Sequence, residues 1–357
     1  MLYLYCMKEI MNKLIESGYE AYIVGGYVRD YLLGIESKDI DICTNAPFSK
    51  INELFKGEGT AYPQYYAVHI ERDGVSYDIT SYRKELSYRR NKPVELEEAP
   101  DLATDLLRRD FTINTFAISN EGMLIDIYGA KKDLDNRLIK VMGDTDTKFR
   151  EDKTRIVRAI RFACTLDFDL HSDITSFLDA KHLQLLNEVP PEFKKKEMDK
   201  IFDSNGTYKF IYLLKHYNMW KSFGIEPIEK VIPTYNRYGI WAQLETKLPF
   251  SNVEKNIINS IKKLVEKGDI AVLDFAIYNE NVIYNAASIL GIEHKVRELL
   301  DILSLHSIIE MDISIGAMLN YVDVYNFKRV YKSVERNIME GKLENRQDAI
   351  IDYLKCM

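Results

Sequence analysis

Several features that would assign this chain to a common protein class are missing from its sequence. Its 357 residues hold four scattered cysteines, Cys6, Cys43, Cys164 and Cys356, and no C-x-x-C pair, so we expect no zinc site. Isolated cysteines favour a reducing compartment, which here is the cytoplasm. No apolar run approaches the roughly 20 residues that span a bilayer. The first ten residues also lack the charged leader and cleavage site of a signal peptide.

Positive charge is also in short supply. Lys and Arg number 48 against 55 Asp and Glu, and the net charge of −7 argues against a general nucleic-acid coat. A local RNA groove is still compatible with this charge, because binding follows the local field. Solvated helix faces are the alternative explanation for the basic clusters that do exist. These are Arg83, Lys84, Arg89, Arg90 and Lys92; residues 194–196 with Lys200; and Lys328, Arg329, Lys332 and Arg336.

The length and the periodicity of the chain predict more than one domain. A chain of 357 residues is too long for one compact core, and its 46% hydrophobic content is typical of a globular protein. Strand signals occur up to about residue 140, and from residue 147 helical periodicity takes over. The sequence therefore predicts an α+β protein. Its expected parts are a head with a mixed sheet over residues 1–140, an all-helical neck over 141–205, and a helical body and tail over 206–357.

The most informative segment is residues 22–44. An apolar strand at residues 21–24 runs into Gly25 and Gly26, a short helix opens at about Val28, and a second strand follows at 39–43. Glycine lets backbone N–H groups approach a phosphate closely, and the helix directs its positive end to the same place. This order of elements predicts a phosphate cradle, although glycine pairs also occur at such turns without any ligand.

Two aspartates stand on the second strand of this segment. Asp39 and Asp41 lie at i and i+2, so their side chains leave the same face of a strand, roughly 6–7 Å apart along the backbone. We expect both to hold a divalent metal, with Asp78 on a strand at 75–81 completing the group of catalytic carboxylates. Hard oxygen ligands beside phosphates favour Mg²⁺. The alternative is a pair of exposed aspartates with no ligand.

These residues, GGYVRDYLLG followed by DID, resemble the signature of the class II tRNA nucleotidyltransferases and bacterial poly(A) polymerases, in the polymerase-beta-like nucleotidyltransferase superfamily. The likeness covers roughly residues 8–202 and implies that superfamily's fold for the head. Further matching segments follow in the family's order. They are residues 77–83, 108–114, 126–134 and 149–163, with a weaker match at 189–198, where Phe193 replaces the family's arginine.

The resemblance implies a nucleotide pocket around the segment RRDFTIN. It assigns the ribose hydroxyls of the incoming nucleotide to Asp110 and the phosphates to Arg109, with Arg108 and Asn114 in the same pocket. The residues themselves predict a buried strand at 111–118. Arg29 has two equal explanations, a phosphate contact or a structural ion pair with Asp30.

A helix from about residue 149 is expected to carry Asp152 and Arg155 as neighbours at i and i+3. A surface salt bridge worth under about 1 kcal/mol is one explanation. The resemblance implies another, in which this pair selects cytosine and adenine without a nucleic-acid template. Arg158 and Arg161 follow on the same helix, and we expect one to reach the triphosphate and the other to brace the neck.

The resemblance implies addition of the 3′-terminal CCA to tRNA from CTP and ATP. A CC-adding, A-adding or poly(A)-adding enzyme is the alternative within the family, and the loop between Arg83 and Asp105 bears on this choice. That loop keeps Tyr88 and Pro93 of the family's pattern, with Lys92 where the family has arginine. An inactive RNA-binding protein and a small-molecule nucleotidyltransferase are less favoured. The sequence leaves the oligomeric state open.

Overall fold

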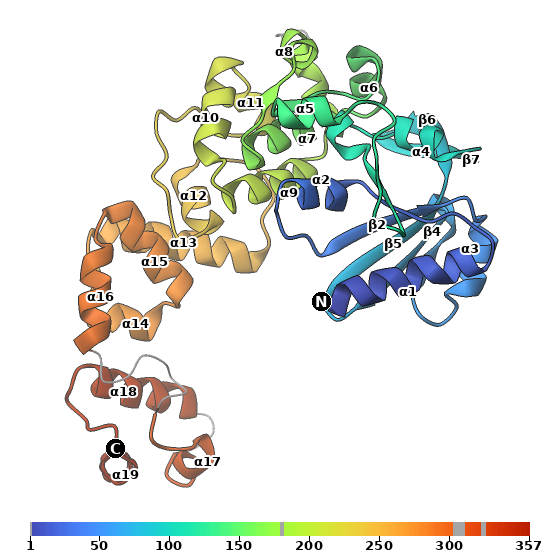
Figure 1. Cartoon of the computed structure of the whole chain (residues 1–357). Coiled ribbons are helices and arrows are strands. Elements are labelled where there is room, and N and C mark those ends of the chain that lie inside the picture. The colour runs from blue at the N-terminus through green and yellow to red at the C-terminus, as the bar shows by residue number, and fades with distance from the viewer. Residues whose placement is uncertain (1, 179–181, 303–310, 323–325) are drawn as a thin grey trace. The chain divides into compact units, whose positions relative to one another are not determined.

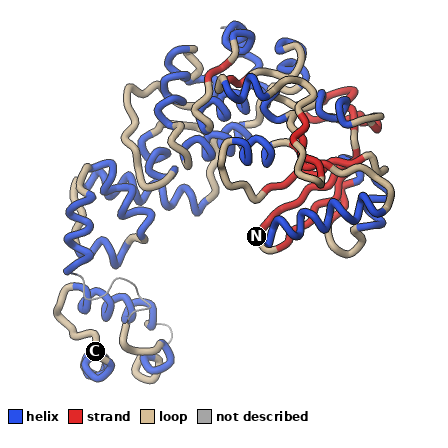
Figure 2. The backbone as a smooth tube through the Cα atoms, in the orientation of Figure 1, coloured by secondary structure: helices blue, strands red, loops and turns tan. Residues whose placement is uncertain are grey.

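The chain divides into two compact units in a computed structural model that describes all residues except 1, 179–181, 303–310 and 323–325. The units are Met1–Phe223 and Gly224–Met357. The predicted α+β class is confirmed, because a mixed sheet occupies the N-terminal part and helices follow it (Figure 2). The finer division at residues 140 and 205 stays a prediction.

The sheet of the first unit places the predicted carboxylates side by side. Strand β2 pairs parallel with β5, and the other neighbouring strands pair antiparallel (Figure 1). Within the described residues this sheet has the order β3-β4-β5-β2-β1-β8-β9. Its strands are β1 (Tyr22–Val24), β2 (Asp39–Thr44), β3 (Thr60–Tyr62), β4 (Ala67–Arg72), β5 (Val75–Ser81), β8 (Ala117–Ser119) and β9 (Leu124–Ile125).

Alternation along β2 explains which face of the sheet carries chemistry. Ile40 and Ile42 are fully buried in the core, whereas the carboxylates of Asp39 and Asp41 leave the opposite face. The predicted hairpin turn is confirmed at Asp73-Gly74, which joins β4 to β5 with φ of 52° and 72°. Strand β5 is therefore fixed in register beside β2.

Outside this sheet, the first unit contains helices and short strand pairs. The predicted buried strand at 111–118 is wrong, because the chain makes a 3₁₀ turn at Thr112–Asn114 before β8. The Asp110 carboxylate accepts from the Phe111 N–H and from Asn114 Nδ2, which stabilises that turn. The other strands are β6 (Arg83–Arg89), β7 (Lys92–Glu98), β10 (Leu138–Ile139) and β11 (Asp169–Leu170).

The helices of the first unit follow the apolar periodicity of the sequence. They are α1 (Leu2–Glu16), α2 (Gly26–Leu32), α3 (Phe48–Leu54), α4 (Leu102–Leu107), α5 (Lys131–Asp135), α6 (Thr145–Glu151), α7 (Thr154–Thr165), α8 (Ser172–Phe177), α9 (Pro191–Phe202), α10 (Thr207–His216) and α11 (Trp220–Phe223). Short 3₁₀ helices occur at Pro63–Tyr65, Thr112–Asn114 and His182–Glu188.

The second unit is helical in its described part. Helix α13 begins at a capping box between Ser251 and Glu254 and ends at Gly268, whose φ is 78°. In the residues described, no helix combines the length and apolar character that a membrane crossing requires. The helices are α12 (Arg237–Gln243), α13 (Asn252–Lys267), α14 (Val272–Ile277), α15 (Glu280–Leu290), α16 (Glu293–Ile302), α17 (Ile315–Met318), α18 (Phe327–Met339) and α19 (Gln347–Lys355).

A buried ion pair joins α7 to α9 in the first unit. Arg161 Nε lies 2.8 Å from Glu197 Oε2, and Lys200 Nζ lies 2.6 Å from Glu197 Oε1. Glu197 is 2% exposed. Burial raises its pKa, but the charges of Arg161 and Lys200 outweigh burial and hold the pKa below its usual value. Arg161 is thus the arginine that braces the helices.

Replacing Glu197 by Gln tests this brace. We expect the variant to lose about 3 kcal/mol of unfolding free energy at pH 7, because Arg161 stays buried without its counter-charge. The lowered pKa of Glu197 means that its contribution is present above the unfolded pKa and is lost as the pH falls through the folded pKa. Denaturant unfolding at several pH values should therefore show the difference shrinking in acid.

The control is Glu53→Gln, since Glu53 pairs with Lys50 on an exposed surface. Equal losses in the two variants, or a Glu197→Gln loss that is the same at every pH, would contradict the assignment.

Candidate active site

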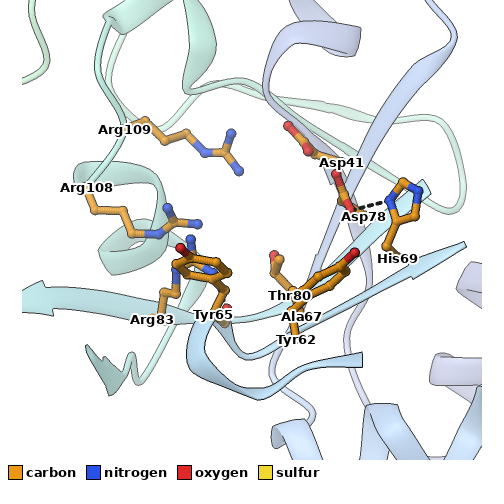
Figure 3. Close-up of a pocket in the computed structure, with 10 residues that line it drawn as sticks. All are labelled: Asp41, Tyr62, Tyr65, Ala67, His69, Asp78, Thr80, Arg83, Arg108 and Arg109. Atoms are coloured by element: carbon orange, nitrogen blue, oxygen red, sulfur yellow. Dashed lines mark hydrogen bonds and ion pairs between the residues drawn. The ribbon is translucent and has the colours of Figure 1, made fainter. Parts of the chain in front are cut away.

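A cavity of about 510 Å³ opens over β2 and β5 in the first unit, on the face that carries the aspartates. Carboxylates lie on one side of it and arginines on another, with two tyrosines between them at the edge (Figure 3). The lining residues are Asp41, Tyr62, Tyr65, Ala67, His69, Asp78, Thr80, Arg83, Arg108 and Arg109.

The acidic side of the cavity is a row across three strands. Asp41 on β2 is the register partner of Asp78 on β5, and Asp78 is the register partner of His69 on β4. His69 Nδ1 lies 2.8 Å from Asp78 Oδ1. This hydrogen bond and the charge of Asp78 raise the pKa of His69. The sheet register therefore brings Asp78 beside Asp41, as the sequence predicted.

The electrostatics of Asp41 fit a cation. Burial raises its pKa, and the neighbouring carboxylates Asp39 and Asp78 raise it further, although Arg109 opposes them. A divalent ion between Asp39 and Asp41 would relieve this repulsion, and carboxylate oxygens are the ligands that hard cations prefer. Among the residues described, no group of three or more His, Cys, Asp or Glu side chains is arranged to hold a metal by itself.

The glycine turn between β1 and α2 closes tightly on the acids. Gly25 has φ of 79°, and a Cβ there would lie 2.6 Å from Asp41 Oδ2 and 2.7 Å from Arg109 Nη1. Residue 25 is the N-cap of α2, so the first N–H groups of that helix open at the same place. Gly26 begins the helix, two residues earlier than the sequence predicted.

The arginine side of the cavity has more positive charge than its carboxylate partners balance. Arg108 Nε lies 2.9 Å from Asp105 Oδ1, and Arg109 Nη2 lies 3.8 Å from Asp105 Oδ2. Burial and repulsion from Arg108 lower the pKa of Arg83 to about 10, so Arg83 is still charged at neutral pH. Buried Nε atoms of Arg83 and Arg109 have no hydrogen-bond partner within the described residues. Such a surplus fits a polyanion.

Arg29 forms the ion pair with Asp30 that is one of its two predicted roles. Its guanidinium donates to Asp30 Oδ1 at 2.7 and 2.8 Å and to Asn114 Oδ1 at 2.7 Å, and the residue is 6% exposed. The Cζ atom of Arg29 also lies over the Phe162 ring, 4.7 Å from the centroid of the ring. Asn114 is buried beside it and donates to Asp110 at 2.9 Å. Arg29 and Asn114 therefore connect α2 to the segment that carries Asp110.

Asp110 is held by Arg158 from α7. Arg158 Nε donates to Asp110 Oδ2 at 2.8 Å, and Nη2 forms an ion pair with the same oxygen. Burial raises the pKa of Asp110, but the charge of Arg158 and the hydrogen bonds hold it well below its usual value. The carboxylate is therefore ionised and can accept further hydrogen bonds.

The structure corrects the expected placement of Asp152 and Arg155 on one helix. Helix α6 ends at Glu151 and α7 begins at Thr154, with Asp152 in extended backbone between them. Asp152 Oδ1 accepts from the Thr154 N–H at 2.9 Å, so its side chain binds the backbone at the first residue of α7. Asp152 Oδ2 still lies 4.0 Å from Arg155 Nε, so the predicted pair remains within ion-pair reach.

Arg155 is anchored by the segment that the sequence predicted as a loop. That segment is a hairpin of β6 and β7, turning at Arg90 and Asn91 with φ of 51° and 62°. Arg155 Nη2 donates to the Tyr88 hydroxyl at 2.9 Å and lies 3.9 Å from Glu85 Oε2. Arg155 is 5% exposed. The surface-salt-bridge explanation for it is therefore wrong.

Sequence reasoning missed several residues of the cavity. His69, Tyr62 and Tyr65 stand two or three residues apart before and within β4, and nothing in their spacing marks them as facing the aspartates. The hairpin signal at Asp73-Gly74 would have paired His69 with Asp78 had the register been counted from the turn. No local signal identifies Tyr62 and Tyr65, which reach the cavity from the edge strand β3 and from the 3₁₀ helix that follows it.

The amino-acid sequence matches the model of the Poly A polymerase head domain over residues 21–140. It is 40% identical over 206 residues to a CCA-adding enzyme of Bacillus pumilus, a match that spans 57% of this chain and 51% of that protein. It is 27% identical to a CCA-adding enzyme of Streptococcus agalactiae over 97% of this chain and 95% of that protein. The chain therefore matches the Bacillus pumilus enzyme over only about half of that protein's length.

Solved structures share the fold. The crystal structure of the Bacillus stearothermophilus CCA-adding enzyme in complex with CTP superposes with a TM-score of 0.72 at 21% identity, covering 98% of this chain and 95% of that one. The Thermotoga maritima CCA-adding enzyme complexed with tRNA superposes with a TM-score of 0.60 at 18% identity, covering 99% and 94%. At these identities the likeness establishes the architecture.

The close approach at residue 25 gives a direct test of the cradle. We expect Gly25→Ala to weaken binding of a magnesium nucleoside triphosphate at least tenfold, because a Cβ would displace Asp41 or Arg109. Calorimetric titration with CTP measures this. Gly57→Ala is the matched control, since Gly57 has φ of 82° and open space around its Cβ position. An equal effect of the two substitutions on affinity would show that backbone strain alone is responsible.

Proposed function

We propose that this chain, a member of the class II tRNA nucleotidyltransferase and bacterial poly(A) polymerase family, adds the 3′-terminal CCA to tRNA from CTP and ATP with release of pyrophosphate. The observation that carries this proposal is the cavity in which Asp41 and Asp78 face surplus arginine charge across a glycine turn. The similarity to CCA-adding enzymes over most of the chain supports it. We place the protein in the cytoplasm, in keeping with its four free cysteines.

Members of this family use divalent metal ions, and we propose Mg²⁺ held by Asp39 and Asp41. When bound, the ions would activate the attacking 3′-hydroxyl and neutralise charge on the leaving pyrophosphate. The chain itself supplies the geometry around them. Asp78, oriented by His69, faces the side of Asp41 away from the glycine turn. Its carboxylate is therefore positioned to accept a hydrogen bond from the 3′-hydroxyl.

The triphosphate would lie along the glycine turn and the arginines. The N–H groups at Gly25 and Gly26 open at the N-terminus of α2, where an anion is favoured. Arg109 lies beside Gly25, and Arg108 lines the same cavity. Asp110, ionised and fixed by Arg158 and Asn114, would accept the ribose hydroxyls and so favour a ribonucleotide.

Base selection would fall to Asp152 and Arg155. A carboxylate accepts from an exocyclic amino group, and a guanidinium donates to a ring nitrogen or carbonyl oxygen. Cytosine and adenine present an amino group there, whereas uracil and guanine present a carbonyl. Because Arg155 is held by Tyr88 and Glu85, its donors have a fixed direction. We further propose that residues 1–140 act as the catalytic head, 141–205 as the neck and 206–357 as the tRNA-binding body and tail.

A CC-adding enzyme is the second candidate. Lys92, which stands where the family's loop has an arginine, leaves this activity open. The ordered hairpin of β6 and β7 carries Lys92 at the first position of its second strand. CC-only products from the assay below would select this candidate.

The product assay decides between these activities. tRNA ending at the discriminator base is incubated with each labelled nucleoside triphosphate, alone and together, and product lengths are read on a gel. We expect three added nucleotides with CTP and ATP together, and two with CTP alone.

Asp39→Ala and Asp41→Ala should each reduce incorporation at least 1,000-fold while tRNA binding survives, because the metal ligands act on the chemical step. Asp73→Asn, at the exposed β4–β5 turn, is the control. Near-normal turnover in either alanine variant would refute the metal assignment.

Arg155→Ala tests the selection of the base. We expect the preference for CTP and ATP over UTP and GTP, expressed as a ratio of kcat/KM, to fall by roughly tenfold or more, because the donors to the base are lost. The control is Arg150→Ala, since Arg150 pairs with Asp146 on the exposed face of α6. Unchanged selectivity in Arg155→Ala would remove the template role.

A further inference from the structure

Two tyrosines at the edge of the sheet form a rim of the active-site cavity that no catalytic role accounts for. Tyr62 ends β3 and Tyr65 ends the 3₁₀ helix that follows it, and their side chains line the cavity (Figure 3). Tyr62 is 40% exposed and Tyr65 is 36% exposed. Large aromatic surfaces left open at the mouth of a polar cavity are typical of ligand contacts.

The sheet order places these rings on one side of the acids and the glycine turn on the other. Along β3-β4-β5-β2-β1, the aspartates lie on β5 and β2, Tyr62 lies on β3, and the glycine turn follows β1. Strand spacings of about 4.8 Å put β3 roughly 10–14 Å from the carboxylate strands. The two reactants can therefore approach the acids from opposite sides.

In-line displacement assigns a reactant to each side. The attacking oxygen and the leaving pyrophosphate lie on opposite sides of the phosphorus atom. The glycine turn follows β1, and Arg109 Nη1 approaches it at Gly25, so the pyrophosphate is assigned to that side. The RNA 3′-hydroxyl then approaches from the β3 side, where Tyr62 and Tyr65 stand.

The floor between the tyrosines and the acids has room for a flat group. Tyr62 is the register partner of Ala67, and Ala67 is the register partner of Thr80. Both floor residues are small, and both line the cavity. The turn that carries Tyr65 is held in place, because Arg83 Nη1 donates to the Tyr65 carbonyl oxygen.

We propose that Tyr62 and Tyr65 are positioning residues that stack on the 3′-terminal base of the RNA primer and hold its 3′-hydroxyl beside Asp78. The proposal rests on the nucleotidyltransferase function proposed above. Aromatic side chains are the usual platform for unpaired RNA bases, and stacking tolerates any base. That tolerance suits an enzyme whose primer end changes with every nucleotide added.

The test is a kinetic cycle that combines protein variants with a changed primer. Tyr62→Ala and Tyr65→Ala are each compared with Tyr→Phe at the same position, on tRNA lacking CCA and on the same tRNA with an abasic terminal nucleotide. We expect each alanine variant to lower kcat/KM for intact tRNA roughly 5- to 150-fold, with KM for CTP unchanged. The phenylalanine variants should stay within about twofold, because they keep the ring.

The abasic primer separates stacking from a structural effect. Wild-type enzyme should lose kcat/KM on the abasic primer by a factor similar to that of the alanine variants on intact tRNA. The alanine variants should lose little more on the abasic primer, since the effects of removing the two partners of one contact are not additive. Tyr31→Ala, on the exposed face of α2, is the matched control and should behave as wild type. Tyr62→Leu and Tyr65→Leu, which keep apolar volume, replace any alanine variant that unfolds at the assay temperature.

Three results would overturn the proposal. The first is a rise in KM for CTP with the tRNA parameters unchanged, which would assign the rings to the incoming base. The second is that the losses of kcat/KM from the alanine variant and from the abasic primer add fully. The third is an abasic primer that wild-type enzyme extends normally. Failure of wild-type enzyme to extend any tRNA would instead contradict the proposed function, and the inference with it.

Discussion

The close approach of the glycine turn to the aspartate strand is the constraint on which the rest of the site depends. A Cβ at residue 25 would lie only 2.6 Å from Asp41 Oδ2 and 2.7 Å from Arg109 Nη1, so the absence of this atom lets the turn, β2 and Arg109 approach one another. The turn before α2 thereby lies directly against Asp41 and Arg109, which both line the cavity. The proposed phosphate-binding groups at Gly25 and Arg109 therefore lie directly beside the proposed metal ligand Asp41.

Charge balance around that point distinguishes arginines that each pair with a carboxylate of their own from arginines that share carboxylates. Arg29, Arg158 and Arg161 are paired with Asp30, Asp110 and Glu197. In contrast, Arg83, Arg108 and Arg109 share too few carboxylates, and Asp41 is crowded by its acidic neighbours. Opposite unsatisfied charges on two walls of one cavity favour a substrate that carries both phosphates and a cation.

How far the site could be predicted depends on the range of the interaction. Asp39, Asp41, Gly25 and Gly26 follow from a local pattern, and the Asp73-Gly74 turn fixes the pairing of β4 with β5. The break between α6 and α7 was not predictable from the i, i+3 spacing of Asp152 and Arg155, because the Asp152 side chain competes for the backbone of Thr154. The anchoring of Arg155 by Tyr88 joins residues 67 positions apart, which no periodicity encodes.

The sequence by itself determined the α+β class, the carboxylate pair on one strand face and the glycine turn before α2, because these rest on side-chain alternation and on backbone freedom at single residues. Tertiary structure alone decided which arginines are paired and which face the cavity, and that His69, Tyr62 and Tyr65 stand beside the acids. Those facts depend on strand order and register, which bring together residues whose separation along the chain carries no signal.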